Sequence, residues 1–134
     1  MSLRLTPLSD LKVLSHLIPA YQLTPNTSLQ SKPLMIYNSA FPAAVTASQI
    51  ETHVSTIGVV DPQWRYTMYS RSHFHSTAHE VLVIAHGKAQ LCFGHEHNPQ
   101  RVEAVVAKGD VIVMPAGVAH RLLEDLDGSF EMIG

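Results

Sequence analysis

Hydrophobic positions in residues 43–57 follow the period of a helix. Apolar side chains recur there every three or four residues and make one continuous stripe. A Thr-x-x-Gln sequence at 46–49, or a Ser-x-x-Glu sequence at 48–51, would make a capping box, and Gly58 is a natural residue to end the helix. We therefore predict one helix over residues 43–57, packed on the outside of a sheet.

From residue 63 onward the pattern changes to short apolar runs that are separated by turn-forming residues. Such spacing is typical of an all-β sandwich or barrel. With the apolar run at 34–37 it gives about eight strands, the usual number for a double-sheet jelly roll. The predicted fold class is therefore all-β. The predicted strands are 34–37, 64–75, 80–85, 88–93, 101–107, 110–114, 120–124 and 129–133.

The first 33 residues contain four prolines and Asn26, which favour turns over regular structure. We predict an extended arm there, and such an arm often covers a sheet edge or crosses to a partner subunit. The length of the chain predicts a single domain. In this domain, residues 1–58 supply the arm, the first strand and the helix, and residues 59–134 form the barrel.

Composition excludes several classes of partner. The formal net charge is −2 and the basic residues are scattered, whereas a nucleic-acid interface needs clustered basic charge. No apolar run is long enough to span a membrane. Cys92 is the only cysteine, so an internal disulfide is impossible, and we expect this residue to be a small side chain of the core. A cytoplasmic location is the prediction that fits these features.

Histidine is the unusual residue in this composition. The chain has nine, and six of them fall within residues 73–97. His73 and His75 are two positions apart, so on a strand both imidazoles would share one face. Glu80 needs a turn at 76–79 before a second strand brings its carboxylate beside them. These three groups would suit a divalent transition metal, and His120 is well placed to be a fourth ligand.

Two segments of the chain carry motifs that read His73-x-His75-x4-Glu80-x6-Gly87 and Gly109-x5-Pro115-x-Gly117-x2-His120. These motifs resemble those of the cupin superfamily. The chain departs from the usual cupin pattern at Thr67, where glycine is common, and at Glu124, where asparagine is common. The sequence PNTSLQSKPLMIYNSAF, followed by a helix, the Trp64-Arg65 pair and HFHSTAHE, is also similar from about residue 18 onward to the small single-domain cupins called YjlB-like, whose activity is not established.

This resemblance implies a double-stranded β-helix barrel, also called a jelly roll, that holds one metal. The metal would be divalent Fe, Mn, Ni or Zn. The resemblance also implies a homodimer, for which the N-terminal arm is the obvious element to exchange. Carried over residue by residue, the implied metal ligands are His73, His75, Glu80 and His120.

Other residues near the motifs are candidates for chemistry at the site. Glu124 shares strand parity with His120, so it would point into the barrel and act as a general base, although a place on the rim is the competing interpretation. Tyr69 is a second candidate for moving protons. Arg65 and Arg71 would contact an anionic substrate if no bulge intervenes.

Two further histidine groups have simpler interpretations. His79 should face outward or support a ligand from behind, because it alternates with Glu80. The sequence His-Glu-His at 95–97 repeats the ligand spacing, but it lies in a polar loop and is typical of a solvated turn.

The leading functional hypothesis is a small-molecule metalloenzyme of the dioxygenase, decarboxylase or isomerase type. The metal would act as a Lewis acid or as an O2 carrier. The alternative is a binding or sensor module that uses the same pocket without catalysis. A structural or storage role is the third possibility, but such cupins usually have two barrels and a secretory signal.

Overall fold

The computed structural model describes residues 3–134. This part of the chain forms one α-helix, two short 3-10 helices and nine strands. The helices are α1 (Ala47–Ile57), η1 (Leu8–Asp10) and η2 (Asn26–Ser28). The strands are β1 (Lys12–His16), β2 (Leu34–Asn38), β3 (Arg65–Tyr66), β4 (Glu80–His86), β5 (Lys88–Phe93), β6 (Val102–Ala107), β7 (Val111–Met114), β8 (His120–Asp125) and β9 (Glu131–Ile133).

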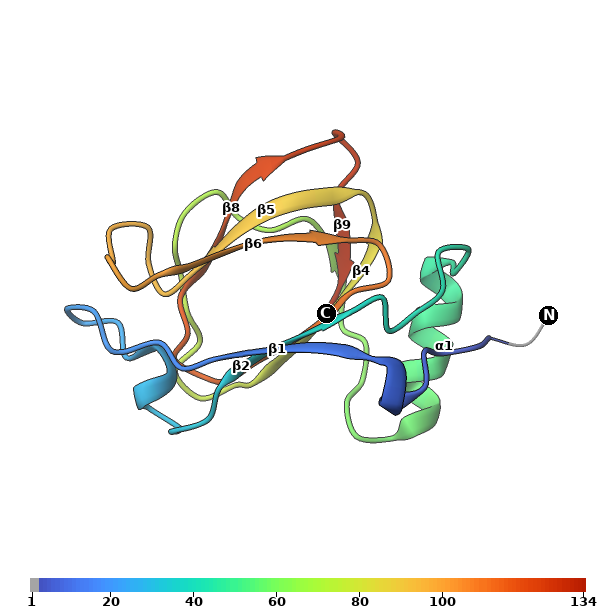
Figure 1. The fold of residues 1–134 in the computed structure, drawn as a ribbon, viewed down its shortest axis with the longest axis horizontal. Helices are drawn as coiled ribbons and strands as arrows, with labels where there is room; N and C mark the ends of the chain where they lie inside the picture. The colour runs from blue at the N-terminus through green and yellow to red at the C-terminus, as the bar shows by residue number, and fades with distance from the viewer. Residues whose placement is uncertain (1–2) are drawn as a thin grey trace.

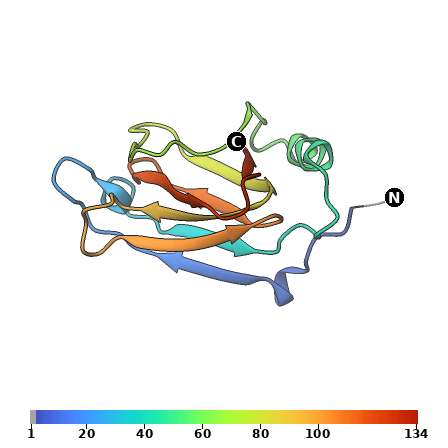
Figure 2. The same cartoon turned by 90° about the horizontal axis from the view of Figure 1, so that it is seen from above.

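The strands make two antiparallel sheets that face each other across the core (Figure 1, Figure 2). Six strands lie in the order β1-β2-β7-β4-β9-β3, and three lie in the order β6-β5-β8. Alternate side chains of both sheets point inward, and Ile84, Leu91 and Ile112 are fully buried between them. Cys92 is buried as well, and burial raises the pKa of its thiol. The predicted all-β jelly roll is confirmed.

Helix α1 lies outside this sandwich and begins four residues later than predicted (Figure 1). Its start is fixed by the first of the two capping boxes. The Thr46 hydroxyl accepts a hydrogen bond from the Gln49 amide, and the Gln49 side chain accepts one from the Thr46 amide. Ile50 packs with Val83 of β4, and the helix ends at Gly58 with φ +74° as predicted. No helix among residues 3–134 combines the length and apolar character needed to cross a membrane.

The N-terminal arm is more regular than predicted. Residues Lys12–His16 form β1, which pairs with β2 along its whole length and so covers that sheet edge. Buried Asn26 then fixes the following turn. Its Nδ2 donates to the Gly94 carbonyl at 3.2 Å, and its Oδ1 accepts from the Ala119 amide at 3.2 Å. The arm is therefore tied to the residue that precedes His120.

The long strand predicted over 64–75 is wrong. Only Arg65–Tyr66 is regular, because it pairs with β9 in the larger sheet. The chain then crosses to the smaller sheet, where the Tyr69 carbonyl accepts from the Leu122 amide at 2.8 Å and His73 makes a β-bridge with His120. A segment that changes sheets cannot keep an unbroken ladder of hydrogen bonds. It does place His73 opposite β8.

Candidate metal centre

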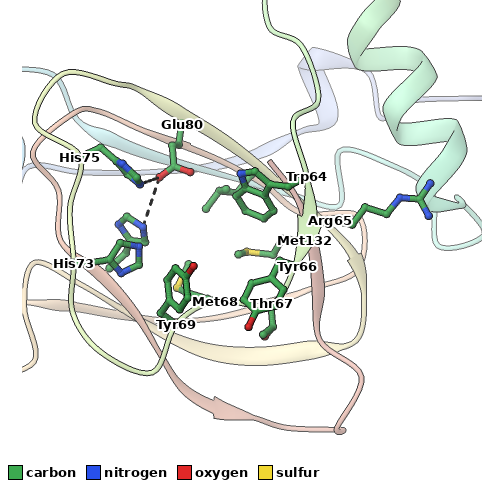
Figure 3. Close-up of a pocket in the computed structure, with 12 residues that line it drawn as sticks. Trp64, Arg65, Tyr66, Thr67, Met68, Tyr69, His73, His75, Glu80 and Met132 are labelled. Atoms are coloured by element: carbon green, nitrogen blue, oxygen red, sulfur yellow. Dashed lines mark ion pairs between the residues drawn. The ribbon is translucent and has the colours of Figure 1, made fainter.

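Three histidines from two segments that are far apart in the sequence come together, and Figure 3 shows two of them, His73 and His75. One ligand nitrogen from each of His73, His75 and His120 lies within 4.8 Å of the other two. The backbone explains this convergence. The His120 amide donates to the His73 carbonyl at 2.9 Å, and the His73 amide donates back at 3.2 Å, so the two residues sit directly opposite each other.

Glu80, at the first position of β4, lies next to this group of three histidines. The chain bends at residues 76 and 77, so the turn expected before this strand is present. Glu80 Oε1 lies 3.0 Å from His75 Nε2 and 3.6 Å from His120 Nε2. This oxygen is buried and makes no hydrogen bond of acceptable geometry. A buried carboxylate oxygen without a hydrogen bond is costly, so a positive group, either a protonated imidazole or a metal ion, suits this position.

Carbonyl groups behind the histidines orient two of the rings. His73 Nδ1 lies 3.2 Å from the Arg71 carbonyl, and His120 Nδ1 lies 3.1 Å from the Val118 carbonyl. A proton on each Nδ1 satisfies these carbonyls and leaves the Nε2 lone pair free for a ligand bond. Burial, with repulsion from the other two histidines, lowers the pKa of His120 to about 4, so this imidazole is neutral at pH 7.

Two of the distances between the candidate donors suit a transition metal. Two bonds of about 2.1 Å at a right angle place their donor atoms about 3.0 Å apart, and a tetrahedral angle places them about 3.4 Å apart. The distances from Glu80 Oε1, 3.0 and 3.6 Å, lie close to these values. Three imidazoles and one carboxylate suit divalent Fe, Mn, Ni or Zn. A metal at their centre would also satisfy the unpaired oxygen of Glu80.

His79 connects the two ligand segments without entering the site. Its Nδ1 accepts a hydrogen bond from the Ala116 amide at 3.0 Å, which ties the loop before Glu80 to the loop before His120. The ring is otherwise exposed. His79 therefore faces outward, and its hydrogen bond goes to the Ala116 backbone, not to a candidate ligand.

Glu96 is a supporting residue that the sequence did not reveal. Its Oε2 accepts from the Ser72 hydroxyl at 2.7 Å and from Arg121 Nη1 at 3.0 Å. Ser72 immediately precedes His73, and Arg121 immediately follows His120. The Ser72 hydrogen bond is the main reason that the pKa of Glu96 is lowered. The interpretation of 95–97 as a merely solvated turn is wrong for Glu96, although His97 is exposed.

A cavity of about 430 Å³ opens beside the four candidate ligands (Figure 3). Its wall comes from the segment that crosses between the sheets and from the inner faces of β4, β8 and β9. The lining residues are Trp64, Arg65, Tyr66, Thr67, Met68, Tyr69, His73, His75, Glu80, Leu82, His120 and Met132.

Only some of the residues that were predicted to act on a substrate face this cavity. Tyr69 lines it, with its ring centroid 5.2 Å from that of His73. The guanidinium group of Arg65 points away toward α1, where its Nε donates to Glu51 Oε2 at 2.9 Å (Figure 3). Arg71 is exposed and lies outside the lining, beside a neighbouring hollow. The expected contact of Arg65 with a substrate anion therefore does not fit the observed rotamer.

The predicted orientation of Glu124 is wrong. It was expected to share the inward face of β8 with His120. In β8, however, Leu122 pairs with Leu91 while Glu124 pairs with the next residue, Gln90, so a bulge inserts one extra residue between them. The bulge reverses the alternation of side chains, and Glu124 is exposed and outside the cavity lining. The rim position was the correct alternative.

Comparison with known proteins points in the same direction as the site. A family model described as "Cupin" matches residues 69–123, which include all four candidate ligands. The chain is 33% identical over 92 residues to "Uncharacterized protein YjlB" of Bacillus subtilis (strain 168). This match covers 68% of the chain and 51% of that protein, so the chain spans about half the length of this curated relative. No solved structure matches the chain.

Proposed function

We propose that this chain, a member of the cupin superfamily, binds one divalent transition metal and acts on a small organic molecule in the adjoining cavity. The metal ligands would be His73, His75, Glu80 and His120. A bound metal would supply Lewis acidity, or O2 binding if it is iron, and the reaction would be a dioxygenation, a decarboxylation or an isomerisation.

The observation that carries this proposal is the state of Glu80. Its Oε1 is buried between two imidazoles and lacks a hydrogen bond. A protein without metal has a simpler way to fill such a space, which is an apolar side chain. A metal ion explains the carboxylate, the three histidines around it and the carbonyl groups that set the tautomers of two of them.

The residues of the chain would contribute orientation, shielding and proton movement. The cavity wall is mainly aromatic and aliphatic, so a bound molecule would displace water from the metal side. Tyr69 is the residue best placed to move a proton, because its ring lies edge-on to His73 at the mouth of the cavity. Glu124 has no part in this arrangement.

A binding or sensor module that uses the same cavity is the second candidate. One observation favours it: apart from the metal ligand Glu80, no carboxylate among residues 3–134 lines the cavity. A general base would then have to be Tyr69 or a water molecule. Turnover of a bound compound by the metal-loaded protein would decide in favour of the enzyme.

Metal content tests the proposal directly. The purified, tag-free protein should carry about one metal per chain by inductively coupled plasma mass spectrometry, and His75→Ala should carry little. His97→Ala is the matched control, because His97 is an exposed histidine outside the site. Iron would point to O2 chemistry, and zinc, nickel or manganese to isomerisation or decarboxylation. Equal, low metal in all three proteins after reconstitution would refute the proposal.

We also propose a homodimer and a cytoplasmic location. The outer edge of β1 is free to pair among residues 3–134, so it could accept a strand from a second copy. Light scattering coupled to gel filtration at micromolar concentration would measure the mass. A monomer at every concentration would refute the dimer, and recovery of the native protein outside the cytoplasmic fraction would refute the location.

A further inference from the structure

Among residues 3–134, no Lys or Arg side chain points into the cavity beside the candidate metal ligands. Arg65 is the only Lys or Arg among its lining residues, and its guanidinium group is held outside by Glu51 (Figure 3). Glu80 supplies a negative charge. Beyond the ligands, the wall consists largely of Trp64, Tyr66, Met68, Leu82 and Met132. A carboxylate or phosphate on the distant part of a ligand would therefore be desolvated without a partner.

One polar atom in this wall lacks a partner. Among residues 3–134, the buried side-chain polar atoms without a hydrogen bond are Thr67 Oγ1 and Glu80 Oε1. Both residues line the same cavity. The proposed metal would satisfy Glu80, but it leaves the Thr67 hydroxyl unpaired. A hydroxyl can donate one hydrogen bond and accept two, so it suits either an alcohol or a carbonyl on a ligand.

From these features we infer that the cavity selects an uncharged, mainly apolar ring compound with a hydroxyl or carbonyl group, and that Thr67 recognises this group. A cavity of about 150 Å³ holds one benzene ring. The volume here, about 430 Å³, therefore has room for a substituted single-ring or two-ring molecule. The inference deepens the proposed function, because it concerns the substrate class of the same site.

The only tryptophan of the chain, Trp64, lines this cavity and reports its occupancy by fluorescence. The probes are cyclohexanol and cyclohexanecarboxylate, which share a ring, differ in charge and do not absorb where tryptophan is excited. The titrations use chelator-treated, metal-free protein. We expect cyclohexanol to bind with a Kd of about millimolar order, as its few heavy atoms allow, and at least tenfold more tightly than the carboxylate.

Two substitutions test the role of Thr67. Thr67→Val should weaken cyclohexanol binding about tenfold, which is about 1.4 kcal/mol, whereas Thr67→Ser should restore it because the hydroxyl is retained. Thr56→Val is the matched control, since Thr56 lies on the exposed side of α1. Circular dichroism of each variant confirms that it is folded.

Three results would overturn the inference: tighter binding of the carboxylate than of the alcohol, unchanged binding in Thr67→Val, or no response to cyclohexanol up to its solubility limit. These outcomes are independent of the metal measurement. A protein that binds metal but fails here keeps the proposed metal site and loses the proposed substrate class, whereas a protein that passes here without binding metal keeps the cavity assignment alone.

Discussion

Glu96→Gln tests whether a distant loop holds the ligand histidines in place. The substitution keeps the shape of the side chain and removes its charge. Wild-type Glu96 Oε2 accepts hydrogen bonds from Ser72 at 2.7 Å and from Arg121 at 3.0 Å. The glutamine amide oxygen has two lone pairs and can still accept both hydrogen bonds, so the loss is mainly that of the negative charge opposite Arg121. For partly exposed groups we expect it to be about 1–2 kcal/mol.

This loss of folding stability should lower the melting temperature by a measurable amount. With an unfolding entropy of about 2.1 cal/mol/K per residue, a domain of this length has an unfolding entropy of about 280 cal/mol/K. The midpoint temperature of thermal unfolding should therefore fall by about 4–7 °C in a calorimetric scan of metal-free protein. Metal affinity should also fall by about tenfold or more, because the hydrogen bonds that tie Ser72 and Arg121, the neighbours of His73 and His120, to residue 96 become weaker.

The effect should depend on pH in a defined direction. The pKa of Glu96 is lowered in the folded protein. The stabilisation is thus fully present above the pKa of an unfolded glutamate, about 4.3, and disappears as the pH falls through the lower folded value. The difference between wild type and Glu96→Gln should be constant from pH 6 to 8 and shrink below about pH 4.

Glu103→Gln is the control for these measurements. Glu103 also accepts two side-chain hydrogen bonds, from Gln90 at 3.1 Å and from Arg101 at 2.8 Å. It lies on the exposed surface of β6, away from the ligands, so its loss should lower stability by less than about 0.5 kcal/mol and leave metal affinity unchanged. If Glu96→Gln behaves like this control in both assays, Glu96 does not position the site.

Three further predictions concern the cap, the arm and the bulge. Thr46→Ala should lower the melting temperature by about 3–4 °C, since a lost N-cap costs about 1 kcal/mol, whereas Ser48→Ala should change it little in the same scan. Asn26→Ala should lower the free energy of unfolding, measured in urea, by about 1–3 kcal/mol, because the buried Ala119 amide loses its partner, whereas the Gly94 carbonyl keeps the hydrogen bond from Asn98; a loss below about 0.5 kcal/mol would contradict its anchoring role. Glu124→Gln should retain full metal content by mass spectrometry, and a metal-poor variant would show that its outward orientation is wrong.

The sequence was informative where the relevant residues are close together in the chain. His73, His75 and Glu80 span eight residues, so the sequence placed them near one another, although the strand assumed for the two histidines does not form. Gly58 likewise marked the end of the helix, whereas the Thr46 capping box was one of two alternatives and the helix starts four residues later than predicted. The pairing of Glu96 with Ser72 and Arg121 is different, because it joins residues 24 and 25 positions apart. No local pattern distinguishes that glutamate from others in polar loops.

The other errors arose where backbone regularity breaks. Alternation placed Glu124 inside the barrel, but one bulged residue in β8 reverses the side-chain direction, and sequence parity cannot detect it. The N-terminal segment was expected to be irregular because prolines flank it, yet β1 forms since the free edge of β2 provides a partner. In both cases, contacts between distant strands decided the structure.

The interruption at residues 67–72 has the largest consequence for function. A continuous strand over 64–75 would have paired its backbone with one sheet and left no opening. Because the segment leaves β9 and joins β8, its side chains line the space between the two sheets instead. The same crossing carries Thr67 and Tyr69 along the cavity wall and delivers His73 to its place opposite His120. The break in the strand that was predicted over 64–75 therefore creates the cavity and also positions half of the candidate metal ligands.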